Sequence, residues 1–113
     1  MQRAYSLKKN KQFQYVYRRG KSCACRELVL LYVRAPRLQV GFSASKKVGN
    51  SVVRNRLKRL LRENIRPLLP RLKPGLYIFV LREAAVGGTF HTLGASALYL
   101  LRKQQLLMPG GEA

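Results

Sequence analysis

Hydrophobic residues recur with helical spacing in some segments and strand-like spacing in others, so the pattern predicts an alternation of helices and strands. In the segment NKQFQYVYRRG, Phe13, Val16 and Tyr17 are three or four residues apart and fall on one helical face. Asn10 can cap the start of this helix, and Gly20 supplies its end. A first amphipathic helix is therefore expected over 10–20.

Later segments have the character of strands. ELVLLYVRA and GLYIFVLR are almost continuously apolar, and LQVGFSAS alternates between an apolar face and a small, polar one. A short extended piece around 22–25 would precede them, and helices are expected over 51–66 and 89–107. This order indicates one α/β (α+β) two-layer sandwich over 1–113, with flexible tails at 1–6 and 108–113.

The charge of the chain narrows the classes of partner. There are 23 Lys and Arg against 4 Asp and Glu, a formal net charge of +19, which repels itself in a compact state and favours a polyanionic partner. Nucleic acid and an anionic membrane surface are the candidates, and the lack of an amphipathic segment separate from the core pattern favours nucleic acid. No stretch resembles a signal peptide or a membrane-spanning run, so we expect a soluble, cytoplasmic protein.

Residues for catalysis are scarce. The 4 acids are scattered singly, so no pair is expected to hold metal ions for phosphodiester chemistry. His91, the single histidine, is interpreted as a first-turn residue of the last helix. Cys23 and Cys25 are interpreted as small, semi-buried residues in a reducing compartment. We therefore predict no catalytic residue and no metal ligand in the chain itself.

The segment SKKVGNSVVRNRLKRLLREN concentrates positive charge where a helix begins, although the first turn of a helix ordinarily favours acids. An apolar stripe along this helix would pack on the sheet, and the other faces carry basic residues that suit phosphate. A purely solvated polar face is the alternative. The residues predicted to bind nucleic acid here are Lys46, Lys47, Arg54, Asn55, Arg56, Lys58, Arg59 and Arg62.

A second surface combines aromatic rings with cations. Phe13, Tyr17 and Tyr32 are set among basic residues that include Lys8 and Lys9. This combination suits single-stranded nucleic acid, whose bases stack on rings while cations follow its backbone. Packing of the rings in the core is the alternative, but the small, polar face of 38–45 favours a groove beside the first helix.

The segment SKKVGNSVVRNRLKRLLRE resembles the signature of the bacterial ribonuclease P protein family, with Arg54, Asn55 and Arg56 as its RNR motif. The resemblance continues through LKKNKQFQYVYRRGKS and VGFSASKK and covers 7–103. It implies a fold like the second domain of ribosomal protein S5. That fold has a four-stranded sheet, three helices and a left-handed βαβ crossover formed by the RNR helix.

The resemblance also implies a function as the protein subunit of the ribozyme that removes the 5′ leader from precursor tRNA. The RNA subunit would carry catalysis and hold the Mg²⁺ ions, and the protein alone would be inactive. The basic helix would bind the RNA subunit, and the leader would lie in a cleft lined by Lys8, Lys9, Phe13, Tyr17 and Tyr32. Neither a membrane nor a stable protein partner is expected.

Two alternatives from other classes stay open. One is a ribosomal or nucleoid protein with no role in catalysis, which would show no preference for precursor over mature tRNA. The other is an autonomous nuclease, which would cleave RNA in a metal-dependent way when free of any RNA subunit.

Overall fold

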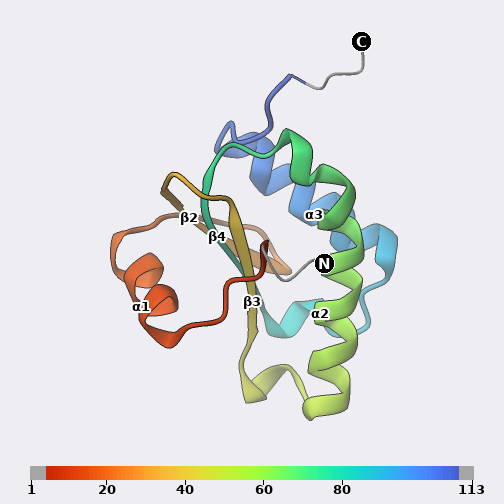
Figure 1. Ribbon diagram of the computed structural model, residues 1–113. Helices are drawn as coiled ribbons and strands as arrows, with labels where there is room; N and C mark the ends of the chain where they lie inside the picture. The colour runs from red at the N-terminus through yellow and green to blue at the C-terminus, as the bar shows by residue number, and fades with distance from the viewer. Residues whose placement is uncertain (1–4, 110–113) are drawn as a thin grey trace.

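The computed structural model describes residues 5–109 and has the expected order of helices and strands (Figure 1). The helices are α1 (Asn10–Arg19), α2 (Ser51–Ile65) and α3 (Phe90–Lys103). The strands are β1 (Lys21–Ala24), β2 (Leu28–Arg34), β3 (Gln39–Ala44) and β4 (Gly75–Leu81). Short 3₁₀ turns, η2 (Lys46–Val48), η3 (Arg66–Arg71) and η4 (Glu83–Ala85), lie between them.

The strands form one mixed sheet in the order β1-β2-β4-β3. β2 pairs antiparallel with both β1 and β4, whereas β3 pairs parallel with β4. A parallel pair needs a crossover connection, and α2 supplies it between β3 and β4. The left-handed sense of this crossover stays a prediction.

The helices cover the two faces of the sheet unequally: α2 and α3 lie together on one face, and α1 lies on the other (Figure 1). Because side chains alternate along a strand, β2 sends Leu28 and Leu30 into the larger core beneath α2 and α3. Leu31 points the other way, into a smaller cluster with Val16 of α1. The predicted two-layer sandwich therefore consists of the sheet and the α2–α3 pair, and α1 adds a partial layer on the opposite face.

Close contact between α2 and α3 depends on Asn64 and Gly94. The Asn64 Nδ2 donates to Leu60 O at 3.0 Å within α2 and to Phe90 O at 2.8 Å at the start of α3. A Cβ atom at position 94 would collide with the Asn64 Oδ1. Glycine is thus required here, although it lowers the helix propensity of α3.

Several element ends differ from the sequence-based expectation. Asn10 is the first residue of α1 rather than its cap. α3 ends at Lys103 because Gln105 adopts a left-handed φ of 58°. Much of the two predicted tails lies outside the described residues. Within them, Ser6 bridges to Val40, and the Met108 N–H donates to Arg71 O at 2.7 Å, so both residues are held against the fold.

No helix within 5–109 is long and apolar enough to cross a membrane.

Candidate nucleic-acid interface

The start of α2 gathers lysines beside helix N–H groups that have no partner within the helix. Exposed Lys46 and Lys47 form η2, and Gly49 then takes a φ of 149°, a conformation that favours glycine. The Asn50 Oδ1 accepts the Val53 N–H at 3.0 Å and so caps the helix. The first turn of α2 contains no acid. This arrangement attracts phosphate through both charge and N–H donors.

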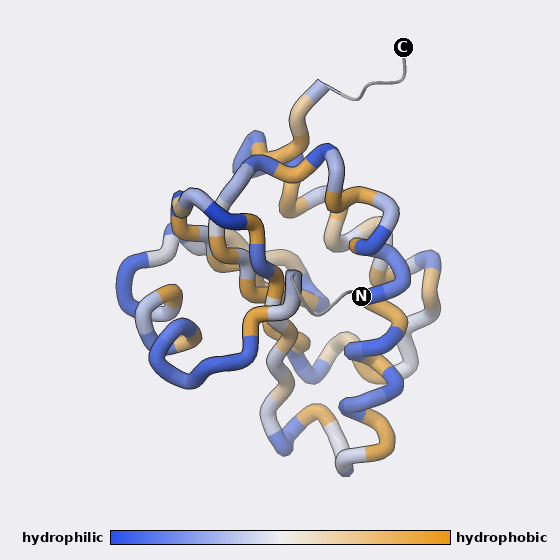
Figure 2. The backbone as a smooth tube through the Cα atoms, viewed as in Figure 1, coloured by the Kyte–Doolittle hydropathy of each residue, from blue (hydrophilic) through white to orange (hydrophobic). Residues whose placement is uncertain are grey.

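Hydrophobic and hydrophilic residues alternate along α2 with helical spacing (Figure 2). Leu57, Leu61 and Ile65 are buried in the larger core, which confirms the predicted apolar stripe. The remaining predicted residues of α2 divide by exposure into two groups. The flank row is half-buried and consists of Arg54, Lys58 and Arg62; the outer residues are exposed and are Asn55, Arg56 and Arg59.

The flank row runs beside β3. The Arg62 guanidinium lies 5.6 Å from the centre of the Phe42 ring, and Phe42 stacks on Phe79 with ring centres 5.9 Å apart. The Nε of Arg54 is buried and has no hydrogen-bond partner. A buried donor without a partner is unusual, and an RNA phosphate or base edge would satisfy it. The contact between Arg62 and Phe42 was missed from sequence, because it depends on how α2 sits across the sheet.

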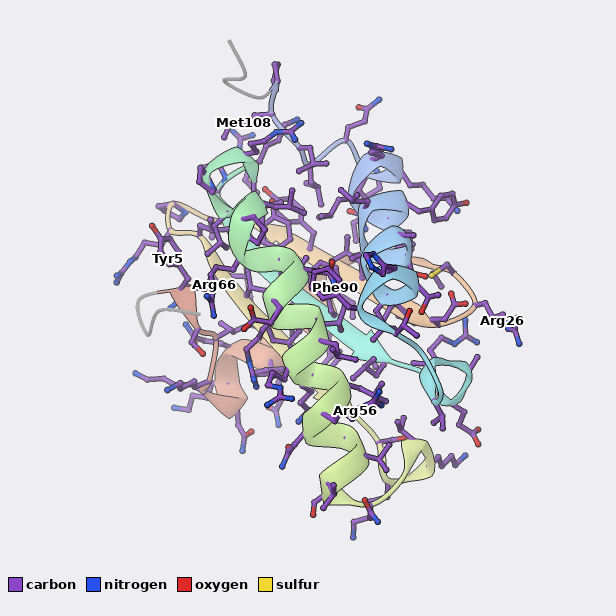
Figure 3. The ribbon with its side chains drawn as sticks, turned by 90° about the vertical axis from the view of Figure 1, so that its right-hand side faces the viewer. Tyr5, Arg26, Arg56, Arg66, Phe90 and Met108 are labelled. Carbon is purple, nitrogen blue, oxygen red and sulfur yellow. The ribbon has the colours of Figure 1, made fainter. Side chains whose placement is uncertain are left out.

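The outer residues face away from the core. Figure 3 shows α2 in front of the sheet beside α3, with Arg56 on the N-terminal half of α2 and Phe90 where the two helices meet. Exposed guanidinium groups keep their full set of donors for bidentate contacts with phosphate. The outer residues therefore present a basic surface to a partner that approaches α2 from solvent.

Acidic groups do little to neutralise these cations. Within 5–109 a single ion pair forms, between Arg66 Nη2 and Glu63 Oε2 at 3.0 Å, and its side chains are 55% and 47% exposed. The carboxylate of Glu27 accepts a hydrogen bond from Ser96 Oγ at 2.9 Å on the α3 side of the sheet. The positive charge of α2 remains available to a partner.

The described residues hold no recognisable catalytic constellation. No group of three His, Cys, Asp or Glu side chains gathers there in a way that could hold a metal ion. His91 is exposed on α3, where its ring lies edge-on to Phe90 with centres 5.5 Å apart. Cys23 and Cys25 are half-buried free thiols. The functional groups that the structure does bring together are donors and cations suited to phosphate.

The aromatic surface of α1 consists of one packed ring and one free ring. Phe13 is half-buried against Gly41 of β3, where a Cβ atom would lie 2.7 Å from the Phe13 Cζ. Phe13 therefore fills part of the groove that the small, polar face of β3 was expected to leave open. Tyr17 is 46% exposed, with its ring centre 6.3 Å from that of Phe13. Lys8 and Lys9 are exposed just before α1, so the free Tyr17 ring has cations near it in the chain.

The expectation that Tyr32 lies beside these rings is wrong. Tyr32 packs on the opposite face of the sheet, with its ring centre 4.8 Å from that of Tyr77 in the larger core. The neighbouring Leu31 is the residue of β2 that faces α1. Because alternation sends successive side chains to opposite faces, an error of one position moved the ring to the wrong side.

Comparisons with known proteins identify the family of the chain. The family model described as Ribonuclease P matches residues 1–105. The chain is 42% identical over 109 residues to the ribonuclease P protein component of Bacillus velezensis, and the match covers 94% of each chain. It is 37% identical to the protein of the same name from Exiguobacterium sp., over 98% of this chain and 99% of the relative.

Solved structures give the same result. The Staphylococcus aureus RNase P protein superimposes with a TM-score of 0.86 at 31% identity, over 93% of this chain and 99% of that one. The Thermotoga maritima RNase P protein superimposes with a TM-score of 0.78 at 24% identity, over 87% and 96% of the two chains, and supports the fold alone. The family model and these relatives match almost the full length of the chain, and the chain therefore belongs to the ribonuclease P protein family.

Proposed function

We propose that this chain is the protein subunit of a ribonuclease P ribonucleoprotein and promotes removal of the 5′ leader from precursor tRNA. The observation that carries the proposal is the basic α2, which bears phosphate-binding groups on a fold whose described residues hold no catalytic constellation. The relatives named ribonuclease P protein component match this chain over nearly their whole length. Hydrolysis is then performed by the RNA subunit.

In this proposal, α2 and η2 bind the RNA subunit. Lys46 and Lys47 meet phosphates at the helix start, and the outer residues meet phosphates on the solvent side. The buried Arg54 Nε offers a donor with fixed geometry at the edge of this surface. Binding by many cations releases counterions, so affinity for the RNA subunit should fall steeply with salt.

The α1 surface binds the leader in the same proposal. Tyr17 offers an exposed ring on which a base can stack, and Phe13 holds the start of α1 against β3. Lys8 and Lys9 add cations for the leader backbone. Mature tRNA lacks a leader and gains none of this affinity, so the product is released while the substrate is retained.

Magnesium ions act with the RNA subunit in this proposal. The chain provides cations rather than carboxylate clusters within 5–109, and cations do not bind Mg²⁺. Its positive charge instead screens clustered phosphates and lowers the Mg²⁺ concentration needed for a productive complex.

The test is cleavage of a 5′-labelled precursor tRNA at low Mg²⁺ by bacterial ribonuclease P RNA, with and without the protein. The proposal expects accurate release of the leader only when both subunits are present. Cleavage by RNA-free protein would support an autonomous nuclease. No effect on RNA subunits of several types, with a folded protein, would show that the chain is a general RNA-binding protein.

A further inference from the structure

A groove of about 930 Å³ lies at the end of the sheet where β3 begins, whereas η2 lies at the end where β3 finishes. Segments distant in sequence form its walls: the start of β1, the end of β2, the residues before β4 and the residues after α3. The size is within the range of sites for small organic ligands, about 300–1,000 Å³.

The groove is basic. Lys21, Arg34 and Lys73 line it, and no acidic residue of the described chain contributes to its lining. These three side chains are exposed, and none forms an ion pair within 5–109. The groove therefore has a positive potential that is not offset by neighbouring carboxylates, which favours a phosphate-bearing ligand.

One wall of the groove is a rigid aromatic ring. The Tyr32 hydroxyl donates to Pro74 O at 2.6 Å, and burial raises the pKa of Tyr32, so the hydroxyl keeps its proton. The ring meets Tyr77 at an interplanar angle of 61°. Gly75, with a φ of 151°, permits this placement, because a Cβ atom there would collide with the Tyr32 ring. A ring held in place on several sides loses little entropy when a base stacks on it.

The end of α3 places amides in the same groove. Gln105 has a φ of 58° and is the one non-glycine residue of the described chain with a positive φ, at a position where glycine is usual. Gln104 Nε2 donates to Lys21 O at 3.1 Å and ties α3 to β1. The Leu106 N–H donates to Leu101 O at 2.9 Å and satisfies one of the last carbonyls of α3, which reduces the negative character of this helix end.

We propose that this groove is a second site for single-stranded RNA and takes the distal part of a long precursor-tRNA leader. The ligand class follows from a fixed ring, amides and uncompensated cations, the combination that binds single strands with little sequence preference. The position of Lys21 indicates that the single strand is the leader. Lys21 lines the groove and comes directly after α1 and Gly20, so a leader that passes Tyr17 on α1 can reach the groove around this end of the sheet. This inference rests on the proposed function.

The experiment compares leaders of about 5 and about 20 nucleotides, one near the lower end of the usual site size of single-strand-binding folds and one beyond its upper end. Holoenzymes are assembled with the natural chain, Arg34→Gln, Lys73→Gln, their double variant and the control Arg26→Gln. Arg26 and Arg34 stand at opposite ends of β2, and both are exposed, so Arg26→Gln removes one charge far from the groove. Figure 3 shows Arg26 on a different side of the molecule from Met108, which lies just beyond the groove residue Leu106. Affinity for each precursor is measured by fluorescence anisotropy, together with affinity for the RNA subunit.

The natural chain and Arg26→Gln should bind the long leader more tightly than the short one. In each groove variant the ratio of long-leader to short-leader affinity should fall by about threefold, as expected for one partly exposed charge contact. In the double variant this ratio should fall by about tenfold. Binding of the short leader and of the RNA subunit should not change. An equal ratio of long-leader to short-leader affinity in all variants would overturn the inference. A loss of RNA-subunit affinity, with the same loss for short and long leaders, would also overturn it.

A second measurement separates this inference from the proposed function. The free protein is titrated with a labelled single-stranded RNA, and the groove variants should bind it more weakly than Arg26→Gln does. If the holoenzyme ignores leaders altogether while the groove variants still weaken oligonucleotide binding, the proposed function fails and the single-strand site stands. If short leaders are preferred over mature tRNA and length has no effect, the proposed function stands and the leader site is refuted.

Discussion

Removing two outer arginines of α2 should flatten the salt dependence of RNA-subunit binding without unfolding the protein. Arg56→Gln combined with Arg59→Gln deletes two exposed cations. Each phosphate contact adds about 0.7 to 0.9 to the slope of log affinity against log salt, so the double variant should lose about 1.5 from that slope. Over a tenfold change in salt, this corresponds to about a thirtyfold difference in relative affinity.

Stability should change little, because both side chains are exposed and neither forms an ion pair within 5–109. Glutamine and arginine have similar helix propensities, so α2 itself is preserved. The free energy of unfolding should stay within about 0.5 kcal/mol of that of the natural chain, as measured by urea denaturation.

The assay is binding of labelled RNA subunit by anisotropy at several salt concentrations. The matched control is Lys11→Gln combined with Arg26→Gln, which removes the same charge from exposed positions outside α2. An equal loss of slope in the control would show that only net charge matters. An unchanged slope in the α2 variant would refute the assignment of this helix to the RNA subunit.

Four further predictions concern α1, α3 and the free chain. In a competition assay against mature tRNA, Tyr17→Ala should weaken binding of precursor tRNA by about 1–3 kcal/mol, the value of one base stack. Its affinity for the RNA subunit should not change. Phe13→Ala should also lower the free energy of unfolding by about 3 kcal/mol, because Phe13 packs on Gly41; equal stability of the two variants would contradict the division into a packed and a free ring. Gly94→Ala should cost about 1–3 kcal/mol in urea denaturation, since its methyl group meets Asn64. Polyphosphate should raise the melting temperature of the free chain as a ligand of the folded state, and an unchanged melting temperature would argue against anion binding by that state.

The helices and strands could be predicted because their apolar spacings are long and regular. α2 is the clearest case: Leu57, Leu61 and Ile65 recur every four residues and are buried as expected. The cap of α2 could not be assigned from the sequence, because Asn50 and Ser51 are both common capping residues and only backbone geometry distinguishes them.

The face on which Tyr32 lies could not be read from the sequence. β2 is a nearly continuous apolar run, and such a strand shows no alternation that would tell its two faces apart. The register with β4 decides the question, since it sets Tyr32 opposite Tyr77. The groove residues were missed for a related reason: Lys21, Arg34 and Lys73 are far apart in the chain and meet only at one end of the folded sheet.

The fold keeps its charged residues out of the fully buried core. No charged residue within 5–109 is fully buried, so the cations lie at least partly in solvent and most gain little from contacts inside the protein. Their mutual repulsion must then be reduced by an external polyanion, which couples stability to RNA binding. The sheet also separates the two proposed RNA contacts, because α2 lies on one face and α1 on the other. In the proposed function, a rigid four-stranded layer thus fixes the distance between the RNA subunit and the leader, so that the protein adds affinity only to substrates whose leader reaches α1.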